Sequence, residues 1–199
     1  MKKILSILFT AFMALILTAC GDAAGQGAAT QQNTAQPEAT QPQTEGKKVL
    51  VAYFSHTGNT EKVAQVIQSK TGGDLFKIET ATPYSNVYRE VTEVAKQEKA
   101  DNARPALKNT VSDMAQYDVV FVGYPIWWYT APMAVATFAD SYDFSGKTVI
   151  TFCTSGGSPI SDSTPDMKAW FKGANVVEGI RAYANDAAST ERWLERFGY

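Results

Sequence analysis

Short apolar runs alternate with amphipathic segments from residue 49 to the end of the chain. Three of these runs are almost uninterrupted, 49–54, 118–123 and 148–153, a pattern typical of strands buried on both faces of a parallel sheet. Residues 74–80 alternate apolar and polar side chains, which predicts an edge strand with one buried face. Residues 176–180 predict a last strand.

Segments with apolar residues three and four positions apart follow the strands and predict helices. They cover 61–70, about 85–101, 131–142, 165–172 and 190–197, whereas 104–116 is poorly periodic and predicted irregular. The order is strand then helix, five times. Right-handed crossovers turn this order into a doubly wound, five-stranded α/β sheet, whose ligands bind beyond the carboxyl ends of the strands.

The first 20 residues differ from the rest. Lys2 and Lys3 precede an apolar stretch, 4–17, that is too short to span a membrane, and the segment ends in Leu-Thr-Ala-Cys. This end resembles a bacterial lipobox, which implies that residues 1–19 are a signal peptide and that Cys20 carries lipid. An ordinary signal peptide with a chance Cys is the alternative. We expect an extracytoplasmic protein, lipid-anchored to the bacterial cell membrane.

Residues 21–46 are rich in Gln, Ala, Thr, Gly and Pro and contain no aromatic or large aliphatic residue. Such a composition buries too little surface to offset chain entropy, so 20–46 is predicted to be a disordered linker with a reach of about 28 Å. The folded domain is then 47–199, one domain by length. The formal net charge of −2 becomes −4 when the two lysines leave with the signal peptide, which argues against nucleic acid as a partner.

The loop between the first strand and helix, residues 55–60, reads Ser-His-Thr-Gly-Asn-Thr. A strand–loop–helix arrangement directs free backbone N–H groups and the positive end of the helix dipole at the loop, which suits a phosphate. Its three hydroxyl groups add donors, and its glycine permits close approach of the backbone. An ordinary turn with a Ser or Thr cap is the alternative.

Two further loops follow strands that should end at the same edge of the sheet. Residues 124–130 carry three aromatic rings, which cost free energy on a surface unless they cover something and which stack well on a planar ring. Alternatively, one or both Trp side chains fill a gap beneath the next helix. Residues 154–158 contain paired glycines, which would leave N–H groups free for the polar edge of a ring, unless this is a plain flexible turn.

Together the three loops resemble the phosphate and ring loops of the flavodoxin superfamily, over the whole of 47–199. The resemblance implies strand order 2-1-3-4-5 and noncovalently bound FMN. It also implies that FMN is bound by Ser55, His56, Thr57, Gly58, Asn59, Thr60, Pro125, Ile126, Trp127, Trp128, Tyr129, Thr154, Ser155, Gly156 and Gly157. No Gly-x-Gly-x-x-Gly follows the first strand, which favours FMN over FAD or NAD.

The chain departs from the electron-carrier flavodoxins in two respects. It is nearly balanced in charge, and its loop after the third strand lacks a glycine. Carriers often turn over a peptide there, which puts a residue at positive φ at low cost only for Gly. We therefore expect this loop to stay in place, and we favour a reductase that passes electrons from a reduced donor, NAD(P)H among the candidates, to a quinone or small acceptor. A one-electron carrier that docks to a redox partner and a flavin-free binding module are the alternatives, and the oligomeric state is left open.

Four other side chains lie in or near these loops. His56, the single histidine, fills an unspecified position of the loop, and we interpret it as facing solvent or the phosphate rather than as catalytic. Cys153 ends an apolar strand and is predicted to be a buried small residue rather than a nucleophile. Tyr84 and Tyr129 are placed by their loops near the predicted flavin.

Overall fold

The computed structural model describes Thr44 and residues 46–199. The predicted signal peptide, Cys20 and the linker up to residue 43 lie outside the described residues. Thr44 is buried; its hydroxyl donates to the Phe197 carbonyl (2.9 Å), and its own carbonyl accepts from the Tyr199 hydroxyl (3.1 Å). The polar groups of Thr44 therefore find partners in the folded domain, while the predicted linker boundary at residue 46 stays a prediction.

Five parallel strands form one sheet in the order β2-β1-β3-β4-β5, which confirms the predicted doubly wound fold. Their bounds are β1 (Val49–Tyr53), β2 (Asp74–Lys77), β3 (Val119–Pro125), β4 (Thr148–Thr154) and β5 (Asn175–Arg181). β3 and β4 run past their predicted ends because their pairing continues to Pro125 opposite Thr154. Two of the predicted ligand loops thus begin at neighbouring positions on adjacent strands.

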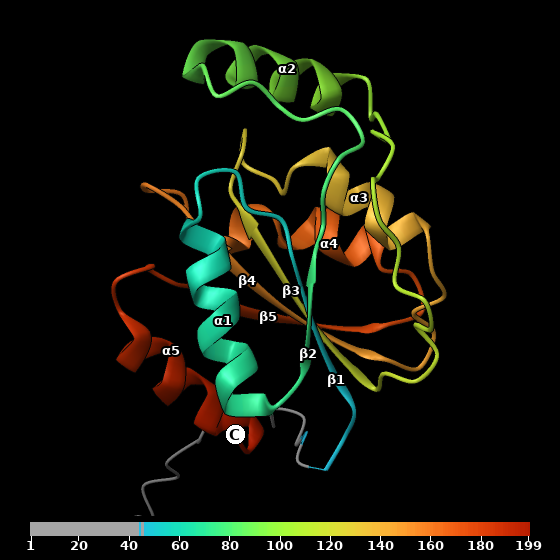
Figure 1. Cartoon of the computed structure of the whole chain (residues 1–199), viewed down its shortest axis with the longest axis vertical. Coiled ribbons are helices and arrows are strands. Elements are labelled where there is room, and N and C mark those ends of the chain that lie inside the picture. The colour runs from blue at the N-terminus through green and yellow to red at the C-terminus, as the bar shows by residue number, and fades with distance from the viewer. Residues whose placement is uncertain (1–43, 45) are drawn as a thin grey trace, which may run out of the picture. The chain divides into compact units, whose positions relative to one another are not determined.

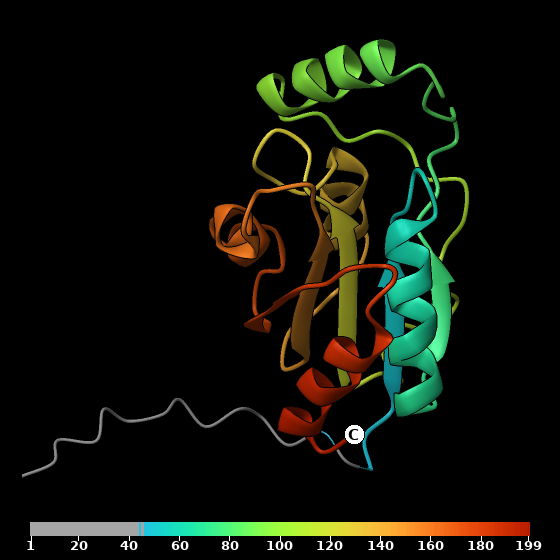
Figure 2. The same ribbon diagram turned by 90° about the vertical axis from the view of Figure 1, so that its left-hand side faces the viewer.

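Five helices connect or follow the strands. They are α1 (Asn59–Thr71), α2 (Tyr88–Ala100), α3 (Met133–Asp140), α4 (Thr164–Trp170) and α5 (Ala187–Leu194), with short 3-10 turns at Ile160–Asp162 and Glu195–Phe197. Figure 2 shows α1 and α5 on one face of the sheet and α3 and α4 on the other. Among the described residues, none of the helices is both long enough and apolar enough to cross a membrane.

The alternation of side chains along β1 explains the two hydrophobic cores. Val49, Val51 and Tyr53 belong to the core beneath α1 and α5. Leu50 and Ala52 belong to the core on the opposite face. Each fully buried aliphatic side chain contributes about 1.5–3 kcal/mol of transfer free energy, so a strand that is apolar at every position is held from both faces.

α2 is placed differently from the other four helices. It lies beyond the end of the sheet, across the side where the predicted ligand loops emerge (Figure 1). Two of its side chains, Val91 and Ala95, are buried, whereas Tyr88 and Val94 are exposed. α2 therefore covers the carboxyl ends of the strands instead of packing on a face of the sheet. It is called the roof below.

Candidate functional site

The loop of residues 55–60, hereafter the hydroxyl loop, ends in the first turn of α1. Gly58 precedes α1 with φ = 86°, a left-handed conformation, and its N–H donates to Ser55 Oγ (3.1 Å). The N–H groups of Asn59, Thr60 and Glu61 have no acceptor among the described residues. The loop thus presents free donors at the positive end of a 13-residue helix, an arrangement that favours an anion.

A hydrogen bond joins the hydroxyl loop to the end of β4. Thr60 is buried, and its Oγ1 lies 2.9 Å from Thr154 Oγ1. Either oxygen is able to donate, so each hydroxyl keeps further capacity for a ligand. This hydrogen bond fixes the distance between the hydroxyl loop, which follows β1, and the end of β4.

The loop of residues 125–130, hereafter the aromatic loop, contains a tight turn. The Trp127 N–H donates to the Thr130 carbonyl (2.8 Å), and the Thr130 N–H donates to the Trp127 carbonyl (3.1 Å). Trp128 and Tyr129, between them, have φ = 49° and 66°. Two consecutive positive φ values define a type I′ turn, which usually contains Asn-Gly. The loop therefore holds two residues at positive φ without a glycine, and the expectation that its backbone stays in place stays a prediction.

The two tryptophans of the aromatic loop have different surroundings. The Trp127 ring lies edge-on to Phe54, His56 and Tyr84, with centroid distances of 5.4, 5.7 and 5.3 Å. Trp127 therefore packs among rings from β1, the hydroxyl loop and the segment before α2, and it also lines the cavity described below. The alternative, a gap beneath the next helix, stays untested. Trp128 is 37 % exposed and contacts α2 instead.

The loop of residues 154–158, hereafter the glycine loop, makes less use of its glycines than expected. The Gly157 N–H donates to Ser155 Oγ (3.1 Å), and the Gly157 carbonyl accepts from Arg181 (2.8 Å). Neither Gly156 nor Gly157 has positive φ, and an added Cβ would meet nothing within 4 Å. The expectation that both N–H groups are free for a ligand is wrong for Gly157, whose N–H is used within the loop.

The three loops and α2 enclose a cavity of about 400 Å³, within the range of small-molecule sites. An adjoining cavity of about 500 Å³ lies toward α1 and the end of β5. Ten of the predicted residues line the first cavity: Ser55, His56, Thr57, Thr60, Pro125, Ile126, Trp127, Trp128, Tyr129 and Thr154. Asn59, Ser155 and Gly156 line the second, and Gly58 and Gly157 line neither.

Sequence reasoning missed the part of the wall that α2 contributes. Tyr88, Val91, Thr92 and Ala95 all line the first cavity, and the glycine loop adds Ser158. An apolar face with helical spacing predicts a helix packed on a sheet, and no local signal in the sequence distinguishes that from a helix over a cavity.

Burial shifts the pKa values of Cys153 and Glu98. Burial raises the pKa of the Cys153 thiol to about 12; Cys153 lies within β4 and is fully buried, which confirms the prediction of an inert small residue. Burial also raises the pKa of Glu98 on α2, and the hydrogen bond that Glu98 accepts from the Tyr84 hydroxyl (2.7 Å) partly opposes this shift. Tyr84 thus supports Trp127 and α2, while Tyr129 lines the cavity.

The chain matches the flavodoxin family over residues 48–197, and it belongs to that family. It is similar to a candidate flavoprotein of Bacteroides eggerthii, with 37 % identity over 77 % of this chain and 99 % of that one and a TM-score of 0.69. A second Bacteroides structure, a candidate flavoprotein of B. uniformis, shares 34 % identity over 76 % and 99 % of the two chains, with a TM-score of 0.70.

A flavoprotein of Lactobacillus acidophilus, solved in complex with FMN, has the same fold. It shares 23 % identity over 74 % of this chain and 98 % of that one, with a TM-score of 0.64. None of the curated proteins compared with the chain is similar to it. The predicted family and the predicted fold are confirmed.

Proposed function

We propose that the protein binds FMN and acts as a redox protein, with the hydroxyl loop holding the phosphate and the first cavity holding the ring. The observation that carries the proposal is the lining of this cavity. The hydroxyl loop, which leads into the free N–H groups of α1, contributes hydroxyl groups, and the aromatic loop and α2 contribute aromatic and aliphatic side chains. A flavin phosphate is anionic and its ring is planar and largely apolar. The family match and the FMN complex of the L. acidophilus relative support this choice.

When bound, FMN supplies reversible electron transfer, and this chain supplies binding, orientation and exclusion of water. The N–H groups of α1 neutralise part of the phosphate charge without a Lys or Arg within the loop. Trp127, held by Phe54, His56 and Tyr84, presents a fixed aromatic wall. α2 covers the cavity opposite the sheet.

The proposed reaction is that of a reductase in which NAD(P)H loses a hydride, which is two electrons and one proton, and a quinone or small acceptor gains these together with one proton from solvent. The experiment is direct: purified protein is loaded with FMN, and steady oxidation of NADH and NADPH is followed with and without a quinone. Acceptor-dependent turnover supports the reductase. A protein that binds FMN and shows no turnover with either nucleotide contradicts it, and one that binds no flavin contradicts the whole proposal.

A one-electron carrier that docks to a redox partner is the second candidate. The observation in its favour is the aromatic loop, which holds Trp128 and Tyr129 at positive φ without a glycine. Positive φ is reached at low cost only by glycine, yet this loop already contains it at two other residues.

We also propose that Cys20 carries lipid and tethers the domain to the outer face of the cell membrane. The support is the sequence of residues 1–20, whose basic start, apolar stretch and cysteine follow the order of a lipoprotein signal. Cys20→Ser is expected to move the protein from the membrane fraction to the soluble extracytoplasmic fraction, because a lipid chain supplies the anchoring free energy. Membrane retention of the variant would contradict the proposed anchor.

A further inference from the structure

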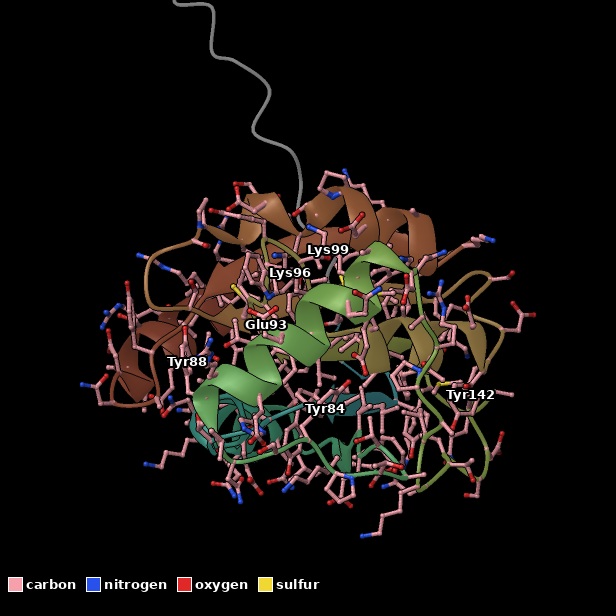
Figure 3. The ribbon with its side chains drawn as sticks, turned by 90° about the horizontal axis from the view of Figure 1, so that it is seen from above. Tyr84, Tyr88, Glu93, Lys96, Lys99 and Tyr142 are labelled. Carbon is pink, nitrogen blue, oxygen red and sulfur yellow. The ribbon has the colours of Figure 1, made fainter. Side chains whose placement is uncertain are left out.

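Trp128 is tied to α2 by contacts from three separate groups. Its indole Nε1–H donates to the Thr92 carbonyl (2.9 Å), and its own carbonyl accepts from Lys99 Nζ (2.6 Å). Lys96 Nζ lies 5.4 Å from the centroid of the indole ring, within the range of a cation–π contact. In Figure 3, Lys96 and Lys99 lie along one side of α2 and Tyr84 lies on the other side.

The backbone of Trp128 is in a conformation that an L residue avoids. Its φ of 49° and that of 66° at the next residue, Tyr129, place both residues in the left-handed region. Such outliers persist only where surrounding contacts determine them, and they concentrate at functional sites. The reciprocal hydrogen bonds between Trp127 and Thr130 close this turn, and the contacts with α2 add to them at Trp128.

α2 has few other attachments. It lies beyond the sheet rather than on it (Figure 1). Its residues Val91 and Ala95 line the cavity that the loops enclose. Apart from the contacts with Trp128, two side-chain hydrogen bonds join α2 to the segment before it, from Tyr84 to Glu98 and from Ser85 to Glu90. A helix with so little packing against a core opens easily unless a specific contact holds it.

We propose that Trp128 is a positioning residue that fixes α2 as the roof of the flavin cavity. This inference rests on the proposed function for its ligand. The indole binds the Thr92 carbonyl and the Trp128 carbonyl binds Lys99, so the roof is held at two points about two turns apart on α2. Val91 and Ala95 then set the height of the cavity and slow the exchange of flavin with solvent.

The experiment measures flavin release and α2 opening in Trp128→Phe, which keeps an aromatic ring and removes the Nε1–H donor. Release of FMN and of riboflavin is expected to accelerate equally, by about threefold to tenfold, as one neutral hydrogen bond would give. Equal acceleration is expected because α2 lies away from the phosphate donors. Amide hydrogen exchange of residues 91–99 is expected to accelerate by a similar factor while that of α1 stays unchanged. Trp170→Phe, on α4, is the matched control.

A second pair of variants tests the roof without touching Trp128. Ala95→Leu places a larger side chain in the cavity and is expected to weaken flavin binding at least tenfold, whereas Ala100→Leu, at the exposed end of the same helix, is expected to change it less than twofold. Unchanged α2 exchange or unchanged flavin release in Trp128→Phe would overturn the inference. Failure of the unsubstituted protein to bind flavin would instead contradict the proposed function, and the exchange measurement would still decide whether Trp128 pins α2.

Discussion

The hydroxyl loop and the aromatic loop lie at the same end of the sheet and achieve their shapes by opposite means. The hydroxyl loop uses neighbouring residues: Gly58 takes the left-handed conformation at little cost, and Ser55 lies three positions away. The aromatic loop puts Trp128 and Tyr129 in the same region of backbone space, at a cost of about 1–2 kcal/mol each. Contacts with α2, 29 and 36 positions distant in the sequence, hold Trp128 there.

The two loops therefore contribute different properties to one site. Backbone N–H groups at the start of α1 are fixed by the helix itself and act on charge. The aromatic loop and α2 act on shape, and their positions depend on each other. A substitution in the first region should therefore alter which anion binds, whereas one in the second should alter how firmly the ring is enclosed.

The largest expected effect tests whether the hydroxyl loop binds a charged phosphate. Thr57→Val removes a hydroxyl that lines the cavity while keeping the size of the side chain. If that hydroxyl donates to the phosphate, FMN binding weakens by about tenfold to a hundredfold, the equivalent of about 1.5–3 kcal/mol for a charge-assisted hydrogen bond, and riboflavin binding changes little. Titration of each flavin by fluorescence measures this. Thr110→Val, at an exposed position outside the cavity, is the control, and equal losses for both flavins would place the phosphate elsewhere.

A pair of glycine substitutions tests whether the left-handed backbone conformation of the hydroxyl loop requires a glycine. Gly58→Ala imposes a Cβ at φ = 86° and is expected to lower the free energy of unfolding by about 1–2 kcal/mol. Gly156→Ala introduces a Cβ that meets nothing and has no positive φ, so it is expected to stay within about 0.5 kcal/mol of the original protein. Urea unfolding of both variants is the measurement. Equal losses would show that the two glycines serve the same purpose.

The smallest expected effect concerns α2 and depends on pH. Because burial raises the pKa of Glu98, the folded protein binds its proton more tightly than the unfolded chain does. This group therefore makes stability fall as pH rises from the ordinary glutamate pKa through the raised folded value. In Glu98→Gln this part of the pH dependence should be absent. Thermal unfolding of both proteins across acidic to neutral pH measures it; Glu93→Gln, exposed on the same helix, should retain the slope.

Sequence alone determined the strands, the sheet order that the family resemblance implies and the hydroxyl loop. These features depend on neighbours in the chain: Val49, Val51 and Tyr53 alternate with Leu50 and Ala52, and each set needs a separate core. A strand that is apolar at every position has no stable place except the middle of a covered sheet.

The tertiary structure decided the position of α2 over the cavity, the turn of the aromatic loop and the burial of Thr44. α2 has the apolar spacing of any amphipathic helix, and only its position beyond the sheet makes Val91 and Ala95 parts of a cavity wall. Trp128 takes a glycine-like conformation because distant groups on α2 bind its indole and its carbonyl. Local propensity ranks that conformation as unfavourable, and contacts formed only after folding outweigh it.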